Sequence, residues 1–92
     1  MRVVHRAART TKGWRKRAPH IPSDRRALKA RCGAKAFLDP AHLKFPIMAK
    51  TGPCAVDCEG LRTAYARAKQ FRHTKIATKA IGKATAAKCA WI

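Results

Sequence analysis

The sequence predicts a mainly α-helical protein with a small body and a long basic extension. Apolar residues recur at helical spacing in the last third of the chain, whereas prolines divide the middle third. The first 22 residues are rich in Arg and Lys, with Gly and Pro that break any long helix. We therefore expect an extended basic N-terminal arm over residues 1–22 and a small helical body over residues 23–92.

Composition limits how much core this body can contain. Of the 92 residues, 19 are alanine and only 15 are Leu, Ile, Val or Phe. The chain carries 22 Lys and Arg against four acids, a net charge of +18. Few large apolar side chains and high net charge are typical of chains that do not fold alone. We expect neighbouring molecules to complete the order of this chain.

The charge is unevenly distributed along the sequence. The four acids lie between residues 24 and 59, at Asp24, Asp39, Asp57 and Glu59. Residues 1–23 therefore carry +7, residues 24–59 carry +3 and residues 60–92 carry +8. Both ends are suited to contact with nucleic acid or with acidic protein surfaces.

The basic arm supplies the predicted partner-binding residues, in which cationic side chains pair with acidic groups and tryptophan anchors the contact. They are Arg2, Arg6, Arg9, Lys12, Trp14, Arg15, Lys16 and Arg17. Trp91 is a second predicted apolar anchor. The Arg-rich, acid-free start also has the composition of a mitochondrial presequence, which is the weaker interpretation because such a segment is removed.

A short helix is predicted over residues 25–31. Ser23 or Asp24 can cap its first turn, because their side-chain oxygens accept hydrogen bonds from free amides. Gly33 suits its C-terminal end.

Residues 34–56 show neither helical nor strand periodicity and predict an irregular, partly extended, proline-broken wrap. Gly52 and three prolines, Pro40, Pro46 and Pro53, divide it. Its large apolar residues are expected to supply much of the core: Phe37, Leu38, Leu43, Phe45, Ile47 and Met48.

Two helices forming an αα-hairpin are predicted over residues 57–72 and 74–88. Asp57 and Thr74 are the predicted caps. The first helix has an apolar stripe at Leu61, Ala64, Tyr65, Ala68 and Phe71. The second repeats the spacing at Ile76, Ala77, Ala80, Ile81 and Ala84, and its alanines permit close approach.

The four cysteines, Cys32, Cys54, Cys58 and Cys89, allow three interpretations. Two disulfides would stabilise a chain with a thin core. Unpaired thiols and a four-cysteine zinc site are the alternatives, although only one pair is close in sequence and its spacing is C-x3-C. An antiparallel hairpin would return Cys89 beside Cys54 and Cys58, which favours one of these as its partner.

No constellation of an enzyme or cofactor site is present in the sequence. Ser23 is the single serine, and the four carboxylates offer no acid–base pair. The histidines His5, His20, His42 and His73 lack metal-ligand spacing and are expected to be solvated or packed. We expect no catalytic residue, no cofactor, no small-molecule substrate and no membrane span. No zinc-finger, RRM or homeodomain signature appears either.

Several short motifs resemble a family of small basic virion proteins from large icosahedral DNA viruses of algae and protists. They are Arg31-Cys32-Gly33, Phe37-Leu38-Asp39-Pro40, Leu43-Lys44-Phe45-Pro46-Ile47, Cys54, Asp57-Cys58-x-Gly60-Leu61 and Ala64-x-x-Arg67-Ala68. The resemblance covers about 40 residues and leaves out the basic arm. It implies a minor capsid protein located in the virion that cements neighbouring capsid subunits.

The sequence thus predicts a non-enzymatic structural component of a large viral particle, with other capsid proteins as partners. The alternative function is a basic nucleic-acid-binding protein, either genome-condensing or of the ribosomal type. Nucleic-acid binding by such a chain depends steeply on salt, because phosphate contacts release counterions.

Overall fold

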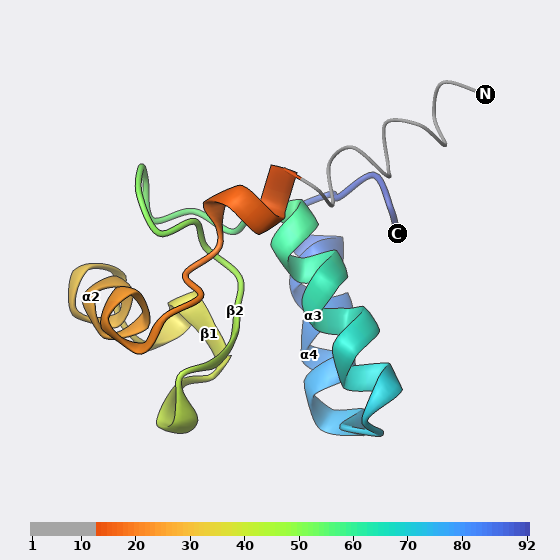
Figure 1. Ribbon diagram of the computed structural model, residues 1–92. Coiled ribbons are helices and arrows are strands. Elements are labelled where there is room, and N and C mark those ends of the chain that lie inside the picture. Colours follow the sequence, from red (N-terminus) through yellow and green to blue (C-terminus); the bar gives the residue numbers. More distant parts are fainter. Residues whose placement is uncertain (1–12) are drawn as a thin grey trace.

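The computed structural model, which describes residues 13–92, has three layers with a two-stranded sheet in the middle (Figure 1). Helix α2 lies on one side of the sheet, and the helices α3 and α4 pack together on the other. The elements are α2 (Pro22–Cys32), β1 (Phe37–Asp39), β2 (Lys44–Pro46), α3 (Cys58–Gln70) and α4 (Thr74–Ala86). Mainly α-helical structure is confirmed.

The end of the predicted extended arm is helical instead. Residues 13–17 form a helical turn, and Ala18 N–H donates to the Trp14 carbonyl at 2.7 Å. Trp14 and Ala18 are buried, so packing of the indole fixes this turn against the body. Pro19 then disfavours helical geometry at residue 18. The rest of the predicted arm, residues 1–12, lies outside the described residues.

Helix α2 begins earlier than the predicted cap would allow. Its N-cap residue is Ile21, which makes no side-chain capping bond, and Pro22 occupies the first turn. Proline suits that position because its φ is already helical and it has no amide to leave unpaired. Capping by Ser23 or Asp24 is therefore wrong. The predicted end is confirmed: Gly33 adopts φ 87° and donates its N–H to the Lys29 carbonyl at 2.8 Å.

The central segment is more regular than expected. Strands β1 and β2 pair antiparallel, with Phe37 opposite Pro46 and Asp39 opposite Lys44. Short 3₁₀ turns at Ala34–Ala36 and Pro40–His42 flank β1. The strands have three residues each, too short for alternation to be recognised in the sequence.

The two faces of the β-hairpin pack into two different hydrophobic cores. Phe37 and Met48 pack with Leu28 and Cys32 on the α2 side. Leu38 and Ile47 pack instead against α3 and α4. Successive side chains of an extended chain point to opposite faces, so each of the dipeptides 37–38 and 47–48 serves both cores. The prediction that this segment supplies much of the core is confirmed.

The αα-hairpin is confirmed, and so is its first cap. The Asp57 carboxylate accepts from the amides of Glu59 at 3.0 Å and Gly60 at 3.1 Å. The cap predicted at Thr74 is wrong: His73 is the N-cap residue of α4 and makes no side-chain capping bond. Small buried residues form most of the contact between the helices, including Ala64, Ala68, Ala77, Ala80 and Ala84.

The prediction that the apolar stripe of α3 is buried as far as Phe71 is wrong, because Phe71 is 56% exposed. Both helices stop at a non-glycine residue in the left-handed region, Arg72 at φ 59° and Lys88 at φ 56°. The following amides donate back into the helices, from His73 to Ala68 and from Cys89 to Ala84. This is the usual hydrogen bonding of a helix end that glycine favours.

Candidate functional site

The cysteines form two disulfides, Cys32–Cys54 and Cys58–Cys89. The zinc and free-thiol alternatives are therefore wrong, and pairing of Cys89 with the start of the first hairpin helix is confirmed. Cys32–Cys54 holds the loop before α3 against α2. Cys58–Cys89 holds the chain end against the start of α3.

A network at the start of α3 joins the 13–17 turn to the body. The Arg17 guanidinium donates to both oxygens of Asp57, at 3.0 and 3.2 Å, and also pairs with Glu59. The Arg17 carbonyl accepts from the amide of Lys50 at 2.9 Å. Arg17 was a predicted partner-binding residue, yet its guanidinium is already occupied within the chain.

Both predicted tryptophan anchors also pack inside the molecule. Trp14 is 5% exposed, and its ring lies where a Cβ on Gly60 would stand. Trp91 donates its indole N–H to the Cys58 carbonyl at 2.7 Å and packs beside Tyr65. Of the other predicted partner residues, Arg15 and Lys16 are exposed. Arg2, Arg6, Arg9 and Lys12 lie outside the described residues.

The carboxylates are largely engaged by the chain itself. Asp57 and Glu59 bind Arg17, and Asp39 accepts from the His42 ring at 3.1 Å. The hydrogen bond from His42 lowers the pKa of Asp39 below its ordinary value of 3.8. Asp24 lies in the first turn of α2, where the helix dipole favours a negative charge.

The largely exposed charged side chains of residues 13–92 are all Lys or Arg. All four acids are half-buried, whereas fifteen Lys and Arg side chains are exposed. The fifteen are Arg15, Lys16, Arg26, Lys29, Arg31, Lys35, Lys44, Lys50, Arg67, Lys69, Arg72, Lys75, Lys79, Lys83 and Lys88. They lie on every layer of the fold.

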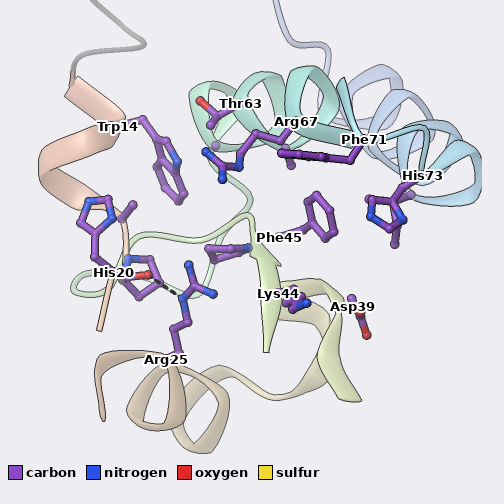
Figure 2. A pocket seen from close by; sticks show the side chains of 16 residues that line it. Trp14, His20, Arg25, Asp39, Lys44, Phe45, Thr63, Arg67, Phe71 and His73 are labelled. Atoms are coloured by element: carbon purple, nitrogen blue, oxygen red, sulfur yellow. Dashed lines mark hydrogen bonds between the residues drawn. The ribbon is translucent and has the colours of Figure 1, made fainter. Parts of the chain in front are cut away.

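A cleft of about 800 Å³ opens between the layers. The 13–20 segment, α2, the β-hairpin and the α3–α4 turn all contribute to its lining. Figure 2 shows Arg67 reaching into it from α3 and Arg25 from α2, with the rings of Phe45, Phe71 and His73 along the rest of the wall. Phe45 and His73 meet edge to face, with their ring centroids 5.8 Å apart.

The cations of the cleft are held to different degrees. Arg25 donates to the carbonyls of Pro19 at 3.0 Å and Leu43 at 2.9 Å, which fixes its guanidinium. The side chains of Arg67 and Lys44 are exposed and make no hydrogen bond to any residue between 13 and 92. Asp39 is the one carboxylate that lines the cleft, and it is bound to His42.

Sequence reasoning did not assign these cleft residues to a site. Arg67 and Phe71 are four residues apart and so share a helix face, which was a usable signal. Their approach to Lys44 and Phe45 depends on packing of the hairpin against α3, which no local pattern encodes.

The fold and surface define a small, two-disulfide helical protein with a cationic exterior and one aromatic-lined basic cleft. No protein-family model matches the sequence, and neither a curated protein nor a solved structure is significantly similar to it. Within the described part of the chain, no helix is long and apolar enough to cross a bilayer.

Proposed function

We propose that this protein is a non-enzymatic structural component of a large viral particle, a minor capsid protein that cements neighbouring capsid subunits. The observation that carries the proposal is that every largely exposed charged side chain in residues 13–92 is a Lys or an Arg, whereas the four acids are half-buried. Such a surface repels copies of itself and associates with anionic neighbours. The resemblance of residues 31–68 to small basic virion proteins supplies the viral setting.

The distribution of the cations favours protein neighbours on several sides. Proteins that bind nucleic acid commonly concentrate Lys and Arg on one face or along one helix. Here Lys29 is on α2, Lys50 on the loop before α3, Lys69 on α3 and Lys79 on α4. A subunit enclosed by acidic neighbours in a shell makes use of cations on all its layers.

The disulfides support a structural role because they hold the body in one shape despite its thin core. The loop between β2 and α3 has few buried side chains, but Cys32–Cys54 ties it to α2. The Arg31 guanidinium adds hydrogen bonds to the carbonyls of Gly52 and Lys50, at 2.6 and 3.1 Å. A rigid cationic body suits a component that keeps fixed contacts with its neighbours.

The test is selective extraction of the purified particle. We expect nuclease alone to leave the protein in the shell fraction and raised salt to release it, because its contacts are ionic. Lysine-directed cross-linking before extraction should join Lys29 and Lys79 to other capsid proteins. Release by nuclease alone would refute the cementing role and favour the alternative, a nucleic-acid-binding protein.

A further inference from the structure

The cleft between the layers is defined by unusual backbone geometry as well as by its side chains. Phe45, which lines the cleft, has a positive φ, and Leu43 and Arg72, which also have a positive φ, each adjoin a lining residue in the sequence. Phe45 adopts φ 57° within β2, a conformation that bulky side chains rarely take. Strain of this kind gathers at binding sites, where surrounding packing maintains it.

This geometry places two aromatic rings beside exposed cations. Phe45 turns into the cleft and meets His73, while the ring of Phe71 is 56% exposed (Figure 2). Arg67 precedes Phe71 by one helical turn, and Lys44 adjoins Phe45. A ligand that satisfies all four side chains carries negative charge together with a flat apolar face.

A nucleotide has both properties, and its single-stranded form exposes them. Bases in a duplex are stacked on one another, whereas unpaired bases can stack on aromatic side chains while their phosphates bind Arg and Lys. An acidic peptide would pair with Arg67 and Lys44 but offers no matching face for Phe71. The cleft volume of about 800 Å³ lies in the range of small-ligand sites and is too small for a duplex.

Cations continue beyond the cleft at the α3–α4 turn. Lys69, Arg72 and Lys75 are all exposed and lie within four residues of Phe71 in the sequence. A strand that leaves the cleft at this turn would meet further positive charge.

We propose that the cleft binds one or two nucleotides of a single-stranded nucleic acid, with a base stacked on Phe71 and phosphates on Arg67 and Lys44. This activity goes beyond the cementing of capsid subunits. Its readout is oligonucleotide binding by the isolated protein, so it succeeds or fails independently of the particle extraction.

The experiment compares binding of a fluorescent fifteen-residue oligothymidylate to the full-length oxidised protein and its variants. Phe71→Leu keeps the charge but removes the ring, and it should weaken binding about ten-fold, since one stacked base contributes on the order of 1–3 kcal/mol. Ile81→Ala, which changes an exposed apolar side chain on α4, is the matched control and should bind like the wild type.

A charge-matched pair separates the cleft from general electrostatic attraction. Arg67→Gln and Lys83→Gln each remove one exposed positive charge. We expect Arg67→Gln to lose several-fold more affinity than Lys83→Gln, and a polyglutamate competitor to displace the oligonucleotide poorly. Equal binding by Phe71→Leu and wild type, equal losses in the two Gln variants, or equal displacement by polyglutamate would each overturn the proposal. The last result would indicate an acidic protein segment as the ligand.

Discussion

The two faces of the central hairpin show two ways of building a small core. Toward α2, large side chains such as Leu28, Phe37 and Met48 fill the space. Toward α3 and α4, Leu38, Ile47 and Leu61 meet a contact made largely of alanines. Each side has one disulfide. The core toward α2 depends on the volume of large apolar side chains, whereas the core toward α3 and α4 depends on the close approach of two helices. The stability of the two cores should therefore respond differently to mutation.

Removing the disulfides should have the largest effect on stability. The Cys32–Cys54 and Cys58–Cys89 links span 22 and 31 residues, and we expect each double Ser variant to lose about 3–4 kcal/mol by the loop-entropy relation. Urea unfolding followed by circular dichroism, with the other disulfide intact, measures both. A loss below about 1 kcal/mol for either pair would show that packing alone holds that face.

A larger side chain in place of a buried alanine should destabilise the core between α3 and α4. Ala80 is fully buried between α3 and α4, so Ala80→Leu should cost about 2 kcal/mol by overpacking. Ala86→Leu, at an exposed position of the same helix, is the control and should change stability little. Equal effects of the two substitutions would contradict close packing at this contact.

Asp57 links the start of α3 to the 13–17 turn. Asp57→Ala removes the cap of α3 and the partner of Arg17, and should cost about 2 kcal/mol. Arg17→Gln keeps the cap but removes the ion pairs of Arg17 with Asp57 and Glu59, and since Arg17 is 39% exposed it should cost less than about 1 kcal/mol. Thermal unfolding of both variants separates the two contributions. If Arg17→Gln cost as much as Asp57→Ala, the cap would be unimportant.

The smallest expected effect is a gain. Arg72 follows the C-terminal end of α3 and has φ 59°. A side chain in this left-handed conformation has a steric cost that glycine does not have, so Arg72→Gly should stabilise the protein by about 1 kcal/mol. Lys69→Gly, three residues earlier and exposed inside the helix, should destabilise by about 1 kcal/mol. A higher denaturant midpoint for Arg72→Gly and a lower one for Lys69→Gly would confirm the position of the helix end. A lower midpoint for both variants would contradict it.

The two faces also differ in how well the sequence predicted them. The α3–α4 hairpin follows from an Asp cap and helical spacing, both local signals. The hairpin at 37–46 escaped prediction, because its strands are three residues long and the adjacent residues Phe37 and Leu38 of β1 are both buried. Periodicity cannot detect a strand in which adjacent residues are both apolar. The exposed position of Phe71 escaped for a related reason, since helical spacing does not show where the opposing layer ends.

The sequence by itself determined the helices, the excess of positive charge and the restriction of the acids to residues 24–59. It also favoured Cys54 or Cys58 as the partner of Cys89, while disulfides, free thiols and zinc all stayed open. Only the tertiary structure decided that Trp14, Arg17 and Trp91 are used internally, since their partners are 33 to 46 residues away in the chain. It likewise decided that Arg67 and Phe71 share a cleft with Lys44 and Phe45. Helices form from neighbouring residues, but a site between layers exists only once the layers pack.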